Sequence, residues 1–229
     1  MNREQAVDRL ATLVDRVENE TMPVPVREVW AFGDVALGLD PVERLDVYLT
    51  KDVIMGGDAD AAAAFEAEYG VKGIGTSVRA EWAEAHPDRV RASDNGYAAP
   101  EKCLAAELVG DSEGRSPSGS RTQSGDSEPI HLEVCNASFE DNVRQRLKGA
   151  LARDAYEEVL DPRGVCLWVD GTRDEEAFDR LRAGSLAMPT LPAALGMLGA
   201  DEDVAREAAD VLKRRRAEQE GSSVRGDMV

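Results

Sequence analysis

The chain has 229 residues, which is enough for one large domain or two small ones with a hydrophobic core. Asp and Glu together number 45 against 27 Lys and Arg, so the formal net charge at pH 7 is −18. An acidic excess of this size argues against nucleic-acid binding by general electrostatic attraction, which needs clustered Lys and Arg. No apolar run approaches the roughly 20 residues that span a bilayer, so we expect no membrane insertion.

The basic residues are mostly arginine, with only 5 Lys among them. Scarce Lys and a large acidic excess favour adaptation to a very salty cytosol, where charge repulsion is screened beyond about 3 Å at 1 M salt. The alternative is an acidic protein encoded by a GC-rich genome. Three widely separated cysteines, Cys103, Cys135 and Cys166, form no zinc-binding pattern. With no signal peptide in the sequence, they indicate a reduced, cytoplasmic location.

The first half of the chain predicts a mixture of helices and strands. Apolar residues at helical spacing predict a helix over 2–20, and Pro23 and Pro25 then lead into a strand over 26–32. A strictly alternating strand over 44–50 places Asp46 on its polar face. The remaining elements predicted in this half are helices over 58–69, 76–85 and 98–109 and a short strand over 89–92.

The second half begins with a Ser- and Gly-rich stretch, 110–128, that has almost no apolar residue and predicts a disordered insert. An alternating strand over 129–135 follows, with His131 and Glu133 on its polar face. The remaining elements predicted here are a helix over 139–156, a strand over 165–169 and helices over 172–183 and 201–218.

Together these elements predict an α+β fold in which helices flank a mixed sheet with one polar face. We expect residues 1–171 to form the core, interrupted by the insert at 110–128. Residues 172–220 are expected to form a C-terminal helical extension packed on that core, and residues 221–229 a frayed tail. The basic run over 213–216 falls at a helix end, where cations complement the helix dipole, so it is not interpreted as a nucleic-acid patch.

The segment Val29–Asp34, followed by Gly38 and the acid-bearing strand Leu45–Leu49, resembles the opening of the nucleotidyltransferase-like superfamily. Members carry a Gly-Ser turn after their first strand, two carboxylates one residue apart on the second strand, and a third carboxylate on a later strand. These acids hold magnesium, which binds the nucleotide triphosphate and activates an attacking hydroxyl. The resemblance implies a nucleotidyltransferase-like core and a candidate ligand site at Gly33, Asp34, Arg44, Asp46 and Glu133.

The chain departs from that pattern at two places. Asp34 replaces the serine, and one of the two paired acids is missing, because Arg44 or Tyr48 stands where it would be. Asp46 and Glu133 remain as candidate magnesium ligands. Because guanidinium can pair with carboxylates in a forked geometry, we predict that Arg44 forms an ion pair with Asp46 or Glu133 in place of the metal.

The whole chain also resembles an uncharacterised family of haloarchaeal proteins, through stretches such as VPVREVW, DVALGLDPVERLDVYLTKDV, HLEVCNA and LDPRGVCLWVDG. Three functions remain open. The first is a catalytically weakened nucleotidyltransferase-like protein that still binds a nucleotide, RNA or a protein partner. The second is an active enzyme of that superfamily with unusual ligands. The third is a structural or regulatory interaction protein without a nucleotide site.

Overall fold

The computed structural model describes residues 1–57, 59–110, 129–218 and 223–226. These residues form a six-stranded mixed sheet with the strand order β5-β4-β1-β2-β3-β6. β1 is antiparallel to both β2 and β4, whereas β2, β3 and β6 run parallel to one another. The strands are β1 (Val26–Phe32), β2 (Leu45–Lys51), β3 (Ile130–Cys135), β4 (Gly164–Val169), β5 (Thr172–Arg173) and β6 (Ser223–Gly226).

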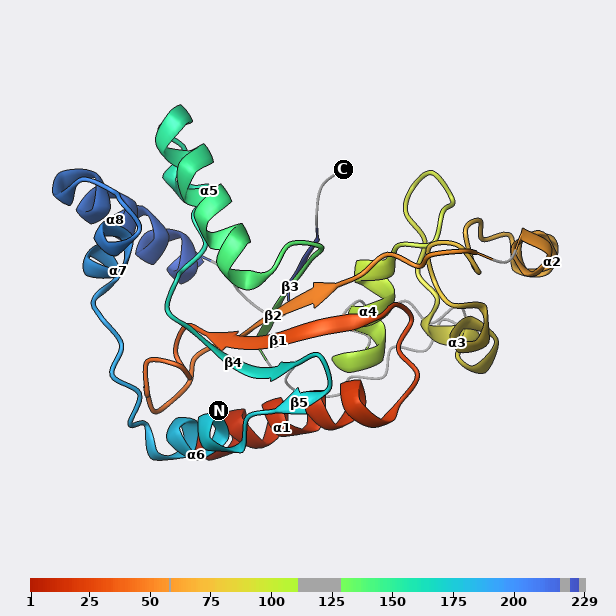
Figure 1. Cartoon of the computed structure of the whole chain (residues 1–229), viewed down its shortest axis with the longest axis horizontal. Coiled ribbons are helices and arrows are strands. Elements are labelled where there is room, and N and C mark those ends of the chain that lie inside the picture. The colour runs from red at the N-terminus through yellow and green to blue at the C-terminus, as the bar shows by residue number, and fades with distance from the viewer. Residues whose placement is uncertain (58, 111–128, 219–222, 227–229) are drawn as a thin grey trace.

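Helices cover both faces of the sheet (Figure 1). In the view of Figure 1, α1 and α6 lie below the sheet, and α5, α7 and α8 lie above it at the opposite end from α2 and α3. The helices are α1 (Arg3–Asn19), α2 (Ala59–Tyr69), α3 (Ala80–Ala85), α4 (Pro100–Leu108), α5 (Phe139–Arg153), α6 (Glu175–Ala183), α7 (Leu191–Met197) and α8 (Glu202–Glu218). No helix among the described residues is both long and apolar enough to cross a membrane.

One face of the sheet is apolar and forms the main core. It presents the alternate residues Val29, Val47 and Leu132 of the three central strands, each at most 1% exposed. The apolar stripe of α1, the buried Phe178 of α6 and Leu104 of α4 pack against this face. The period-2 pattern of the strands and the 3.6-residue pattern of α1 therefore meet in one cluster.

The other face is the polar one that the sequence predicts, but it is buried rather than solvated. Asp46 is fully buried and Glu133 is 3% exposed. Next to them, Tyr48 and Phe32 pack against Phe139 of α5 in a second, aromatic cluster. A cover of helices over a charged face requires that each charge be paired, since an unpaired buried charge costs several kcal/mol, on the order of 3–5.

Most predicted elements are confirmed with their ends shifted by a few residues. The strand expected over 89–92 is wrong, because Pro87–Arg89 is a 3-10 turn and Ala92 makes only an isolated bridge. The helix expected over 139–156 ends at Arg153, because Asp154 adopts a left-handed conformation with φ +53°. α7 was not predicted, since Pro192 looks like a breaker but stands in the first turn, where proline is tolerated.

The C-terminal part differs most from expectation. A frayed tail was expected from residue 221, yet Ser223–Gly226 forms β6 beside β3. The other tail residues, 221–222 and 227–229, lie outside the described residues, as does the predicted insert except for Gly110. α6 packs in the main core with α1, whereas α7 and α8 pack with α5 in a separate cluster. The division of the chain at residue 171 stays a prediction.

Candidate functional site

A cavity of about 510 Å³ opens between the polar face of the sheet and the C-terminal helices. Its volume falls in the range of small-molecule sites, about 300–1,000 Å³. Apolar walls come from the β1–β2 loop, from Val159 and Leu160, and from Leu191 at the start of α7. The charged side chains that line it within the described residues are Asp34, Arg44, Glu133, Arg146, Glu157, Asp161, Arg163, Asp210, Lys213, Arg215, Arg216 and Arg225.

Gly33 forms the turn that places the β1–β2 loop against the sheet. Its φ of +68° is a conformation that side chains with a Cβ adopt at a cost. A Cβ at this position would lie 2.3 Å from Asp46 Oδ2 and 2.7 Å from Arg216 Nη1. Glycine is therefore favoured at this position for two reasons. It adopts the backbone angle without strain, and it has no side chain to collide with the adjacent ion pair.

Asp34 closes the loop that follows. Its Oδ2 accepts hydrogen bonds from the backbone N–H groups of Glu43, at 3.0 Å, and Arg44, at 3.4 Å. Its Oδ1 lies 2.9 Å from Arg216 Nη2. The aspartate thus holds both the loop and a guanidinium group.

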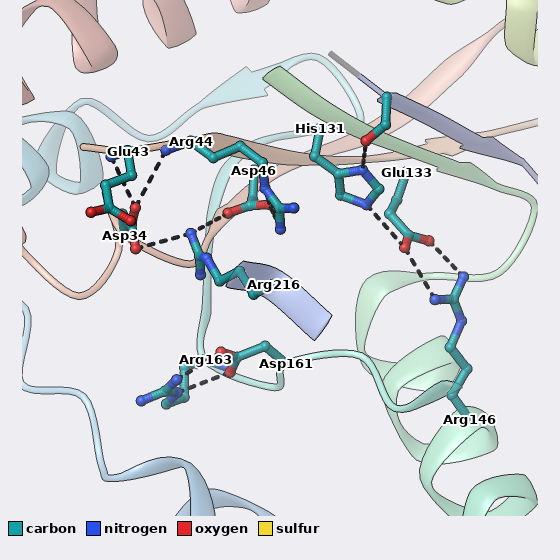
Figure 2. Close-up of polar contacts among 11 residues, drawn as sticks. Asp34, Glu43, Arg44, Asp46, His131, Glu133, Arg146, Asp161, Arg163 and Arg216 are labelled. Carbon is teal, nitrogen blue, oxygen red and sulfur yellow. Dashed lines mark hydrogen bonds and ion pairs between the residues drawn. The ribbon is translucent and has the colours of Figure 1, made fainter. Parts of the chain in front are cut away.

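Asp46 on β2 has both carboxylate oxygens occupied by arginine. Arg44 donates from Nε and Nη2 to Oδ1, at 2.8 and 2.6 Å, and Arg216 Nη2 donates to Oδ2 at 2.7 Å. The predicted ion pair of Arg44 is therefore confirmed, and Figure 2 shows Arg216 pointing between Asp34 and Asp46. Burial raises the pKa of Asp46, and the guanidinium charges of Arg216 and Arg44 oppose this shift.

Glu133 forms a second ion-pair group on β3 (Figure 2). Arg146 of α5 donates from Nη1 to Oε1 at 3.2 Å and from Nη2 to Oε2 at 2.6 Å. His131 Nε2 lies 3.2 Å from Oε1, and its Nδ1 lies 2.6 Å from Ser223 Oγ of β6. Burial alone would raise the pKa of Glu133, but the hydrogen bonds from His131 and Arg146 lower it to about 2. His131 is thus a buried residue of the sheet with a hydrogen-bond partner at each ring nitrogen.

The five residues named from the sequence lie on one side of the sheet but in two groups. Gly33, Asp34, Arg44 and Asp46 share one cluster, in which Arg216 contacts both aspartates. Glu133 lies in the other, on a strand whose His131 is the register partner of Asp46. Arg44 is thus paired with the aspartate and not with the glutamate among the contacts described.

The carboxylates do not fit a magnesium site as they are arranged. Magnesium needs free oxygen ligands in octahedral geometry, whereas both oxygens of Asp46 and of Glu133 accept hydrogen bonds from arginine. Within the described residues, no three His, Cys, Asp or Glu side chains gather in a way that could hold a metal ion. The candidate ligands Asp46 and Glu133 are parts of ion pairs in this structure.

The cations that complete the site were not identified from the sequence. Arg146 lies on the buried stripe of α5, between Val143 and Leu147, and a cation on an apolar stripe is a signal for a buried acid. Arg216 continues the stripe of α8 that includes Ala208. The interpretation of the basic run as a simple helix end is therefore incomplete, since one of its members reaches the sheet.

Another pair of opposite charges lines the cavity just before the start of β4. Arg163 donates to Asp161 with Nε at 2.9 Å and Nη2 at 2.7 Å, and Figure 2 shows this pair facing Arg216. The pair belongs to the segment that leads into β4. Its charges line the cavity and are already matched to each other.

No curated protein and no solved structure matches this chain. One family model matches residues 2–229, which is nearly the whole sequence. The chain therefore belongs to DUF7095, a family of unknown function.

Proposed function

We propose that this protein is a non-catalytic relative of the nucleotidyltransferase-like superfamily that binds a nucleotide in the cavity without magnesium. The observation that carries the proposal is the state of Asp46, whose two oxygens are both held by arginine. In the superfamily that the segment resembles, acids at this strand hold the metal. Here guanidinium groups occupy the carboxylate oxygens that would hold the metal.

The lining of the cavity supports an anionic ligand. Its described lining includes seven Lys and Arg against five Asp and Glu, although the whole chain has 27 against 45. Phe32 and Leu160 add apolar surface on which a base can pack. Apolar walls with convergent charged groups are typical of a small-molecule binding site, and the local excess of cations favours an anionic ligand.

The test is calorimetric titration of the full-length protein with the common ribonucleoside triphosphates in molar potassium chloride, once with magnesium and once with EDTA. We expect binding of equal affinity under both conditions, and no release of pyrophosphate. Binding that requires magnesium, or pyrophosphate release, would show an active enzyme with unusual ligands. The absence of binding under both conditions would favour an interaction protein.

One observation favours that interaction function. Large apolar side chains are exposed in the segment 53–97, with Met55 at 87% and Val53 at 60%. Tyr69 and Tyr97, about half exposed, belong to the same segment. Exposed apolar residues mark a partner-binding surface where they form a contiguous patch, so this segment is the place to seek a protein partner if no nucleotide binds.

A further inference from the structure

The part of the cavity lined by α8 and β6 carries positive charge that forms no ion pair with a carboxylate among the described residues. Lys213, Arg215 and Arg225 line it, and none has a carboxylate partner among the residues that the structure describes. Arg215 donates to the backbone carbonyl of Glu157. The other arginines of the cavity, by contrast, are each paired with an aspartate or a glutamate.

Two of these three cations are partly shielded from water. Arg215 and Arg225 are intermediate in exposure, whereas Glu157 and Asp210, the lining acids that form no ion pair among the described residues, are exposed. Burial lowers the pKa of Arg225, the charges of Arg146 and Arg215 lower it further, and Glu133 opposes them. These guanidinium groups lie close together although the protein has 45 acidic residues that could pair with them. Such a cluster indicates a binding site for an external anion.

We propose that Arg215 and Arg225, with Lys213 at the mouth, bind a phosphate group of the ligand. This inference rests on the proposed function and adds the position of the phosphate, which is the part of the cavity lined by α8 and β6 and not the turn at Gly33. The turn is unsuitable because Asp34 and Asp46 lie beside it. A phosphate monoester carries up to two charges and accepts forked hydrogen bonds, so it can satisfy both arginines at once.

High salt restricts which contacts can contribute to binding. Long-range attraction is screened beyond about 3 Å at 1 M salt, so only direct contacts in a shielded site retain their strength. The half-buried Arg215 and Arg225 meet this condition, whereas the exposed Arg214 next to them does not line the cavity. Arg214 is therefore a matched control of equal charge on the same helix.

The experiment is calorimetric titration in molar potassium chloride with three probes: inorganic phosphate, ribonucleoside monophosphates and the corresponding nucleosides. We expect the monophosphates to bind at least about tenfold more tightly than the nucleosides. Arg225→Gln should weaken phosphate and monophosphate binding by about 10- to 100-fold, since a hydrogen bond to a charged group contributes about that much. Arg225→Lys should retain part of the affinity, and Arg214→Gln should bind like the wild type.

Circular dichroism first establishes that each variant is folded, and Arg215→Gln on α8 provides an independent variant if the β6 substitution unfolds the protein. Equal affinities for nucleosides and monophosphates, or equal affinities of Arg225→Gln and Arg214→Gln, would overturn the phosphate position while leaving nucleotide binding intact. Phosphate binding that depends on Arg225 without any nucleotide binding would retain the phosphate site and overturn the proposed function. If the wild type binds none of the probes, both are overturned.

Discussion

The two faces of the central sheet are buried to the same degree by different interactions. Val47 and Leu132 on one face and Asp46 and Glu133 on the other are all at most 3% exposed. The first face gains its stability from apolar area, in proportion to what is removed from water. The second depends on each charge keeping its partner, so the loss of one group affects all those around it. The two faces should therefore differ in how far a substitution lowers the free energy of unfolding, and in whether a second substitution restores it.

The largest effect is expected from Arg216→Gln. It removes the cation that Asp34 and Asp46 share, leaves a buried carboxylate half paired, and should lower the free energy of unfolding by about 3–5 kcal/mol. Phe178→Ala in the apolar core should cost a similar amount, about 3–5 kcal/mol. Denaturant unfolding in molar potassium chloride measures both.

The two faces should also differ in whether a second substitution restores the lost stability. Adding Asp46→Asn to Arg216→Gln removes the half-paired carboxylate charge. It should restore about 1–3 kcal/mol of unfolding free energy, a coupling typical of residues in contact. The same Asp46→Asn change added to Phe178→Ala should give no such recovery. An Arg216→Gln variant as stable as Arg214→Gln would show that the polar face does not depend on this ion pair.

Glu133→Gln should have the next largest effect, and one that depends on pH. The folded-state pKa of Glu133, about 2, is below its ordinary 4.5, so its charge stabilises the fold at every pH above about 4.5. This contribution, about 3 kcal/mol, should be lost as pH falls from 4.5 towards 2. The difference in unfolding free energy between wild type and variant, measured from pH 7 down to pH 3, should therefore shrink. A difference independent of pH would contradict the ion-pair account.

Gly33→Ala should be more costly than the same change at another left-handed glycine. Gly70 has φ +70°, close to the +68° of Gly33, but a Cβ there would meet nothing within 4 Å. Both variants carry the backbone cost, about 1–2 kcal/mol. Gly33→Ala also displaces the Asp46–Arg216 pair. Its melting temperature in thermal unfolding should therefore be clearly lower than that of Gly70→Ala. Equal melting temperatures would mean that the pair can move aside freely.

The smallest effect is expected at an exposed ion pair. Glu176 and Arg180 form an i,i+4 pair on α6, with side chains 72% and 55% exposed. Glu176→Gln should change stability by less than about 0.5 kcal/mol, and by less still in molar salt, because solvent screens such pairs. Unfolding in low and high salt measures this. A loss of the size expected for Arg216→Gln would remove the distinction between buried and exposed charges.

The apolar face could be predicted from the sequence because its signals are local. Alternation in β2 and β3 and the helical stripe of α1 each place their residues on a face without knowledge of the rest of the chain. For the same reason the sequence could predict the Gly33 turn. It could also predict the pair formed by Arg44 and Asp46, which are only two positions apart. The confirmed ion pair between Arg44 and Asp46 shows that opposite charges two residues apart can be matched from the sequence.

The other half of the site could not be predicted, because its partners come from distant segments. Arg216 and Asp46 are separated by 170 positions, and nothing local to either residue indicates the other. β6 is short and follows a polar stretch, so its residues resembled a tail. The anionic composition also obscured the cavity, since a net charge of −18 gives no indication that cations gather at one place.

β6 has a consequence for how the molecule reaches its final form. Its partner β3 lies far upstream, with Ser223 and His131 separated by 92 positions, and parallel pairings across such a span form late. Until then β3 presents a bare row of N–H and C=O groups, an edge to which a strand of a neighbouring molecule can add. The strand that brings Arg225 to the cavity thus replaces the six-residue edge of β3 with an edge of four residues, and short edge strands are poorer templates for self-association. A chain truncated after α8 should therefore aggregate more readily than the intact chain.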